Sequence, residues 1–117
     1  MERPPTTPEA RAEFDRVCAA VVARGAVLGR MMGTPMIYLA GKGFAGLWGD
    51  AMTFRLEQSE LAEAMDVPGA RPFDPSGGAR PMKAWVEIPL AAASEWNRLA
   101  DLALAAAVAR AKGGTVS

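Results

Sequence analysis

The period of the hydrophobic pattern changes along the chain, and each change predicts a different element. After Thr7 and Pro8, which suit the cap and the first turn of a helix, apolar residues recur at helical spacing until Gly25. Glycine commonly ends helices because it accepts positive φ, so we expect a helix over residues 8–24. Its apolar stripe consists of Phe14, Val17, Cys18, Val21 and Val22.

Residues 26–57 change to short apolar runs separated by glycine-bearing turns, which is typical of antiparallel strands. Gly49-Asp50 suits a two-residue hairpin loop, because glycine tolerates the positive φ of such turns. That loop pairs Leu47 with Met52 and Ala45 with Phe54, and we expect these four side chains to face the helices. The four strands of the resulting meander are expected at residues 26–32, 36–40, 44–48 and 52–56.

The next segment predicts a short helix and a short strand. Ser59 can cap a helix over residues 60–66, and residues 71–73 read as a strand before the turn-rich segment 74–78. The acidic residues of this region fit a solvated helix face near a helix start better than an acid/base pair. They are Glu57, Glu60, Glu63 and Asp66.

The last part of the chain predicts a strand followed by a helix. Residues 83–88 alternate, and Pro89 ends the strand. An alanine-rich helix then runs from about Leu90 or Ser94 to Lys112. In the strand, Ala84, Val86 and Ile88 are expected on one face and Lys83, Trp85 and Glu87 on the other.

The predicted order of elements, α-β-β-β-β-α-β-β-α, separates runs of strands from helices. This order indicates an α+β fold with an antiparallel sheet. The length of 117 residues fits one domain. We expect a single domain over residues 1–117, with residues 1–6 and 113–117 flexible.

The central region also contains short motifs in a characteristic order. They are Met31-Met32-Gly33, Ile37-Tyr38, Gly41-Lys42-Gly43-Phe44-Ala45, Gly49-Asp50 and, closing the series, Met82, Trp85 and Pro89. This order resembles the TfoX N-terminal-like domain family. The family usually has Met-Phe-Gly at the first motif, and this chain has Met32 in place of the phenylalanine. The resemblance implies a two-layer sandwich related to secretion chaperones. The competence regulator that names the family adds a separate C-terminal domain, which the printed sequence lacks, so we expect no competence role.

Composition and charge narrow the classes of function. Half of the residues are apolar and 22% are charged, which is ordinary for a globular protein. The 13 basic residues are balanced by 13 acidic ones, and this balance argues against nucleic acid as a partner. Cys18 is the single cysteine, the N-terminus has no apolar signal segment, and the longest apolar run, residues 102–109, is too short for a membrane span. We expect a cytoplasmic protein without a membrane partner.

The sequence shows no constellation of catalytic residues. It contains no histidine, which removes the usual acid/base at neutral pH and the commonest metal ligand. Cys18 lies on an apolar stripe and is expected to be a buried hydrophobe. The letters Gly41-x-Gly43-x-x-Gly46 match a dinucleotide fingerprint but lie between two strands, so they indicate a turn. We therefore expect no enzymatic activity, no cofactor and no metal.

Two candidate binding surfaces remain. On the sheet face opposite Leu47 and Phe54, the predicted pairing gathers aromatic and cationic side chains, a combination typical of interfaces. A glycine-rich loop at Ser76-Gly77-Gly78 could bind an anion through its backbone N–H groups. The interface candidates are Phe44, Trp48, Arg55, Lys83 and Trp85. The anion-site candidates are Arg71, Arg80 and Lys83.

Three hypotheses of function follow. The first is a non-enzymatic regulatory or adaptor domain that binds a protein partner or forms a homodimer through the aromatic face. The second is a small-molecule or anion-binding domain that uses the glycine-rich loop. The third is a nucleic-acid-binding module that stacks bases on Trp48 and Trp85 beside Arg55 and Lys83. A helix of the same chain packed over the aromatic face would instead make these rings part of the core.

Overall fold

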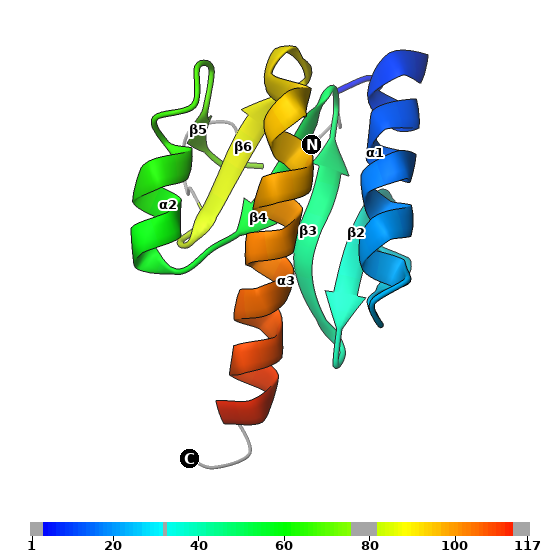
Figure 1. Ribbon diagram of the computed structural model, residues 1–117. Helices are drawn as coiled ribbons and strands as arrows, with labels where there is room; N and C mark the ends of the chain where they lie inside the picture. The colour runs from blue at the N-terminus through cyan, green and yellow to red at the C-terminus, as the bar shows by residue number, and fades with distance from the viewer. Residues whose placement is uncertain (1–3, 32, 76–81, 114–117) are drawn as a thin grey trace.

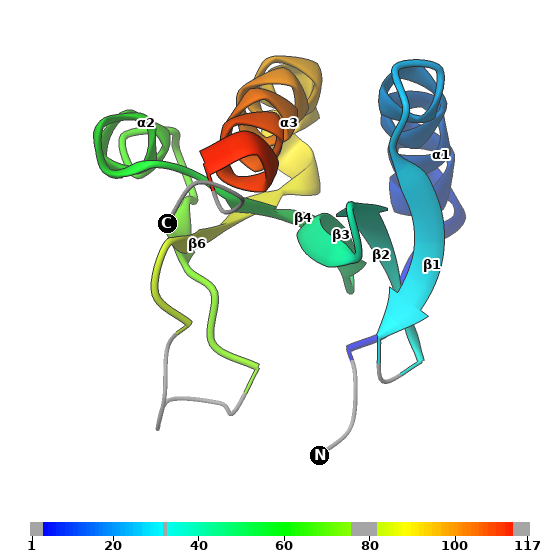
Figure 2. The same cartoon turned by 90° about the horizontal axis from the view of Figure 1, so that it is seen from below.

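The protein folds into one antiparallel sheet covered by helices on one side, as Figures 1 and 2 show. The computed structural model describes residues 4–31, 33–75 and 82–113. The strands follow the order β1-β2-β3-β4-β6-β5 across the sheet. They are β1 (Val27–Met31), β2 (Thr34–Leu39), β3 (Lys42–Trp48), β4 (Ala51–Arg55), β5 (Arg71–Pro72) and β6 (Trp85–Pro89). The helices are α1 (Pro8–Val22), α2 (Gln58–Ala64) and α3 (Trp96–Gly113), with a 3₁₀ helix η1 (Leu90–Glu95) before α3.

This architecture confirms the predicted order of elements and the α+β class with an antiparallel sheet. Consecutive strands from β1 to β4 pair with their neighbours, so the meander over residues 26–57 is also confirmed. In the view from below, α1, α2 and α3 all lie on the same side of the sheet (Figure 2). The opposite side carries no helix within the described residues.

Helix α1 begins where the capping pattern predicts. The Thr7 hydroxyl accepts a hydrogen bond from the Ala10 N–H at 3.2 Å, and Pro8 occupies the first turn. The predicted stripe is buried except for Val22, which is 41% exposed. Val22 lies at the edge of the stripe, about 100° around the helix from Val21, and faces the solvent.

The hairpin between β3 and β4 has the predicted register. Leu47 is opposite Met52, Ala45 is opposite Phe54, and Gly49 takes a positive φ of 61° in the turn. All four paired side chains are buried in the core that the helices cover.

The described part of the N-terminal segment lies against the same turn. The Thr6 hydroxyl donates to the Gly49 carbonyl at 2.8 Å, and the Thr7 N–H donates to Asp50 Oδ1 at 2.7 Å. These two bonds fix the entry of the chain into α1.

Several predicted boundaries are wrong: α1 ends at Val22, β2 begins at Thr34 and β3 begins at Lys42, and two further boundaries have a clear local cause. Helix α2 begins at Gln58, so Ser59 lies inside it and does not cap it; the Leu61 N–H bonds to the Glu57 carbonyl at 2.8 Å. Strand β6 begins at Trp85 because Ala84 has φ of 69°, a turn conformation that breaks the alternation. Lys83 and Ala84 therefore precede the strand.

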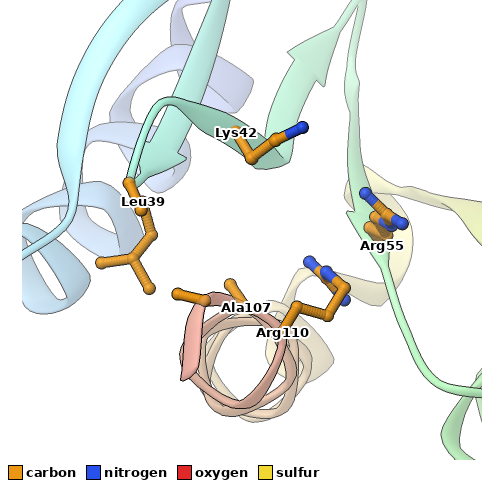
Figure 3. A pocket seen from close by; sticks show the side chains of 7 residues that line it. Leu39, Lys42, Arg55, Ala107 and Arg110 are labelled. Atoms are coloured by element: carbon orange, nitrogen blue, oxygen red, sulfur yellow. The ribbon is translucent and has the colours of Figure 1, made fainter. Parts of the chain in front are cut away.

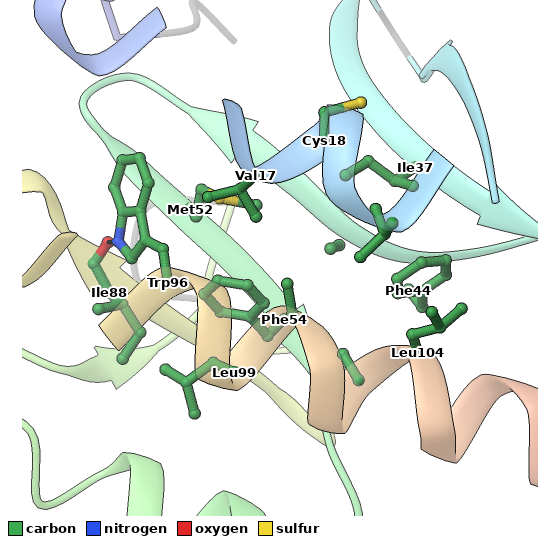
Figure 4. Packing of buried hydrophobic residues seen from close by; sticks show 14 of the residues in the cluster. Val17, Cys18, Ile37, Phe44, Met52, Phe54, Ile88, Trp96, Leu99 and Leu104 are labelled. Atoms are coloured by element: carbon green, nitrogen blue, oxygen red, sulfur yellow. Dashed lines mark hydrogen bonds between the residues drawn. The ribbon is translucent and has the colours of Figure 1, made fainter. Parts of the chain in front are cut away.

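The core lies between the sheet and the helices (Figure 4). At the start of α3, the buried Trp96 indole N–H donates to the Ile88 carbonyl at 3.2 Å, which ties α3 to β6. Farther along α3, Leu99 and Leu104 pack on the rings of the sheet. The largest fully buried side chains are Trp96, Phe14, Phe44, Phe54, Ile37, Met52, Leu56, Ile88 and Leu99.

One of these core residues, Phe44, is expected to be essential for stability. Phe44→Ala should lower the free energy of unfolding by about 3–5 kcal/mol, because it removes a fully buried ring and leaves a cavity. Urea denaturation followed by tryptophan fluorescence measures this change. The matched control is Met31→Ala, at an exposed strand position, which should change stability by less than about 0.5 kcal/mol. A loss below about 1 kcal/mol for Phe44→Ala would show that the ring is not part of the core.

Candidate functional site

The helix-free side of the sheet carries a small aromatic cluster. Trp48 and Phe73 pack edge to face with ring centroids 5.5 Å apart, and the Phe73 and Trp85 centroids are 6.2 Å apart. Met36 and Tyr38 pack beside them. Trp48 and Trp85 therefore lie on one side of the sheet, as the alternation predicts.

This face is less open than the sequence predicts. Phe73, which follows β5, fills the space between the two tryptophans and is itself 6% exposed. Its backbone N–H donates to the Trp85 carbonyl at 3.2 Å, so the segment is held against the strand. Trp85 is 9% exposed as a result, and Trp48 is half-buried. In the described parts of the chain no helix covers this face, but Phe73, from the loop after β5, covers part of it.

The predicted place of Phe44 on this face is wrong. The pairing of β2 with β3 slips between Ile37, opposite Ala45, and Tyr38, opposite Gly43, which leaves Phe44 as an extra residue in a β-bulge. A bulge interrupts the alternation of a strand. Phe44 and Ala45 are consequently both buried in the core under the helices, and Figure 4 shows the Phe44 ring beside Leu104 of α3.

The two predicted cations of the interface also lie elsewhere than expected. Lys83 is exposed and belongs to the turn before β6. Arg55, at the end of β4, is opposite Trp85 in the strand register, but its side chain lines a pocket with residues of α3. Neither cation stacks on the aromatic cluster.

The predicted anion site is only partly described. The loop Ser76-Gly77-Gly78 and Arg80 lie outside the described residues. Arg71 donates to Glu87 Oε2 from Nε at 3.1 Å and from Nη2 at 2.9 Å. Because this carboxylate neutralises Arg71, and Lys83 is a solvated residue of a turn, the described members of the site do not form an anion pocket.

A different group of cations does form a pocket, which sequence analysis did not find. It has a volume of about 390 Å³ and lies where the C-terminal half of α3 passes the β2–β3 turn and the end of β4. Figure 3 shows Lys42, Arg55 and Arg110 around its open space. The lining residues are Leu39, Ala40, Lys42, Arg55, Ala107, Arg110 and Ala111.

Local conformation explains how the pocket forms. Ala40 and Gly41 both have positive φ, 53° and 79°, so the chain turns sharply and Lys42 starts β3 at the pocket's rim. On α3, Ala107 and Ala111 are one turn apart and share a side of the helix with Arg110. Their methyl groups leave space between the helix and the sheet that larger side chains would fill.

Arg110 is the most unusual residue of the pocket. Both of its terminal nitrogens, Nη1 and Nη2, are buried and have no hydrogen-bond partner. Burial lowers the pKa of Arg110, the positive charge of Arg55 lowers it further, and the carboxylate of Glu57 opposes the shift. The guanidinium has thus lost water without gaining an acceptor, which is unfavourable.

The other arginines make this absence informative. Within the described residues, Arg55 and Arg110 are the only arginines whose side chains make no hydrogen bond, and both line the same pocket. Their positive charges repel each other. A bound anion would reduce this repulsion and would also supply the missing hydrogen-bond acceptors. The remaining arginines bond as follows: Arg11 with Asp15, Arg16 with Glu13, Arg24 with Asp101, Arg30 with the Gly33 carbonyl, Arg71 with Glu87 and Arg98 with Glu95.

Other kinds of site have less support. In the described parts of the chain, no group of three or more His, Cys, Asp or Glu side chains is arranged to hold a metal ion. Cys18 is buried, and desolvation raises the pKa of its thiol. The negative charge of Asp15 raises this pKa further, by a smaller amount. A raised pKa reduces the thiolate fraction, which is the reactive form. No described helix is long and apolar enough to cross a membrane.

The state of Arg110 leads to a prediction about stability. In a buffer without multivalent anions, Arg110→Met should leave the free energy of unfolding unchanged or raise it by up to about 1 kcal/mol, because it removes an unpaired, desolvated charge and keeps the apolar stem. The matched control is Arg71→Met, which removes the partner of Glu87 and should cost up to about 1 kcal/mol. Urea denaturation compares the two. A loss of more than about 1 kcal/mol for Arg110→Met would contradict the unpaired state.

Comparisons with known proteins add no relative to this picture. No protein-family model, curated protein or solved structure matches the chain. The similarity to the TfoX N-terminal-like domain family therefore stays a prediction from the motifs.

Proposed function

We propose that this protein is a regulatory or adaptor domain that binds a small anion in the pocket lined by Lys42, Arg55 and Arg110. The observation that carries the proposal is the buried guanidinium of Arg110, whose two terminal nitrogens lack an acceptor. The site differs from the one around Arg71, Arg80 and Lys83 that the sequence suggested, but the class of ligand is the same.

The chemistry of the three cations supports an anionic ligand. The two terminal nitrogens of a guanidinium match two oxygens of a carboxylate or phosphoryl group and can bind them side by side. Such charge-assisted hydrogen bonds are about twice as strong as neutral ones. Lys42 is exposed at the rim, where a mobile ammonium can follow a ligand as it enters. None of the described residues that line the pocket has a side-chain acceptor that could compete with the ligand.

Binding of inorganic phosphate tests this function. Titration calorimetry at low ionic strength should detect phosphate binding to the wild type, and Arg110→Gln should weaken it by at least about tenfold, because a charge-assisted bond contributes about 1.5–3 kcal/mol. Thermal melts should rise with phosphate in the wild type and not in the variant.

The matched control is Arg98→Gln. Arg98 lies on the same helix, about 18 Å from Arg110 along the helix axis. It forms an exposed ion pair with Glu95. Its replacement removes the same net charge, so it should leave phosphate affinity within about twofold. Equal losses in the two variants would mean that phosphate responds only to overall charge, and the proposed pocket would be wrong.

A second candidate function, protein–protein contact, is favoured by the edge strand β1. Among the described strands, β1 pairs with β2 alone, and it exposes three apolar side chains beside Arg30: Val27 is 61%, Leu28 44% and Met31 44% exposed. Exposed apolar edge strands are rare because they recruit other strands. The far edge, β5, is two residues long and contains Pro72, which makes it a poor template. A protein partner or a second copy of this chain could therefore pair with β1.

The original aromatic-face hypothesis can be separated from this one by two variants. Leu28→Lys should reduce self-association if β1 is the interface, because charge on an edge opposes strand pairing. Trp48→Glu should do so if the aromatic face is the interface. Light scattering after size exclusion measures the mass of each, with Lys42→Glu as a control outside both surfaces. A wild-type protein that stays monomeric at high concentration would remove the homodimer.

Two further assignments remain proposals. The TfoX N-terminal-like family and its secretion-chaperone-like two-layer sandwich are supported by the motifs and the order of elements. The cytoplasm is proposed because a chain with a single cysteine cannot form an intramolecular disulfide and needs no oxidising compartment. The nucleic-acid hypothesis is weakened, because Trp85 is buried and only Trp48 keeps part of its ring open for stacking.

A further inference from the structure

The charge of the pocket indicates how much negative charge its ligand carries. Among the described residues, three cations line the pocket, one from each of β3, β4 and α3, and no carboxylate lines it. Within the described part of the chain, the carboxylate that acts on Arg110 is that of Glu57, an exposed residue just before the start of α2. Three positive charges and one nearby negative charge leave an excess of about two. A dianion would neutralise this excess, whereas a monoanion would leave one cation uncompensated.

The shape of the pocket indicates that the ligand also has an apolar part. Figure 3 shows Leu39 and Ala107 on one side of the space, with Arg55 and Arg110 facing them from the other. A volume of about 390 Å³ falls in the range of small-molecule sites and is much larger than one phosphate ion. An ion bound at Arg110 would leave the apolar side in contact with water.

Resting on the proposed function, we infer that the ligand is a small organic phosphate monoester. Its phosphoryl group, which carries nearly two negative charges at neutral pH, binds Arg110 and Arg55 and is approached by Lys42. Its organic part packs against Leu39 and Ala107. A phosphate diester or a carboxylate offers only one negative charge, and inorganic phosphate offers no apolar surface.

Phenyl phosphate and phenyl sulfate test the charge of the ligand. Both carry the same ring on a tetrahedral oxyanion, but at pH 7.5 the phosphate is mainly a dianion and the sulfate a monoanion. In calorimetric titrations of the full chain, we expect phenyl phosphate to bind at least about fivefold more tightly than phenyl sulfate. Equal affinities would overturn the inference.

Lowering the pH provides a second measure of charge. The dianion of a phosphate monoester takes up a proton near pH 6 and becomes a monoanion, so its advantage over phenyl sulfate should fall to less than about twofold at pH 5. The charged groups that face the phosphoryl group are Lys42 from β3, Arg55 from β4 and Arg110 from α3, with Glu57 close to Arg110. Phenyl sulfate binds to the same groups, so it corrects for any change in them. An advantage that persists at pH 5 would contradict the dianion.

Inorganic phosphate and one helix variant test the apolar side. Phenyl phosphate should bind about tenfold more tightly than inorganic phosphate, because the ring removes apolar surface from water. Ala111→Leu should reduce this difference, because the new side chain would occupy the pocket from an exposed position of α3. Ala105→Leu, also exposed on α3 but outside the pocket, is the matched control and should leave both affinities unchanged.

The outcomes separate this inference from the function on which it rests. If no anion binds, or if Arg110→Gln has no effect on any of them, the anion-binding function itself is wrong. If benzoate or phenyl sulfate binds as tightly as phenyl phosphate, the anion site stands and the phosphate monoester is overturned. If inorganic phosphate matches phenyl phosphate, the ligand has no organic part that the pocket recognises.

Discussion

The packing of α3 against the sheet is the interaction on which the rest of the structure depends. The helix presents Trp96 and Leu99 to the sheet at one end and mainly alanine side chains toward the other. Large side chains anchor the first turns, and the Trp96 hydrogen bond to the Ile88 carbonyl fixes their position. Small side chains along the rest of the helix fill less of the layer between helix and sheet. The core is therefore complete near the start of α3, while near its end a space remains that cations from β3 and β4 share with Arg110.

Local sequence patterns predicted most of the fold, since most of it depends on local constraints. Two residues between strands fix a hairpin register, so the pairing of Leu47 with Met52 could be worked out from Gly49-Asp50 alone. The place of Phe44 could not, because it depends on a bulge between β2 and β3. A bulge reflects how one strand fits another, and the apolar run over residues 44–48 gave no sign of it. Period-two reasoning holds along an uninterrupted strand and fails at the first extra residue.

The candidate site was harder to predict than the fold for a related reason. Trp48 and Trp85 were placed together correctly, since both follow from strand alternation, but Phe73 comes from a loop whose path no periodicity describes. Lys42, Arg55 and Arg110 are far apart in the sequence, and each would be an ordinary solvated cation on its own element. Only the three-dimensional arrangement shows that Arg110 and Arg55 lack acceptors. Such convergence leaves almost no signal in a single sequence.

The unpaired guanidinium also bears on why the pocket exists. An arginine with buried nitrogens and no acceptor opposes folding. The described arginines outside the pocket each donate hydrogen bonds to a carboxylate or to a backbone carbonyl. Stability alone would favour an apolar residue at position 110, because Leu39 and the alanines of α3 already form an apolar surface there. Natural proteins tolerate such local conflicts mainly at functional sites. The desolvated Arg110 beside Arg55 lowers the stability of the free domain, and a bound anion would restore that stability. Anion binding and folding are therefore coupled through the charge of Arg110.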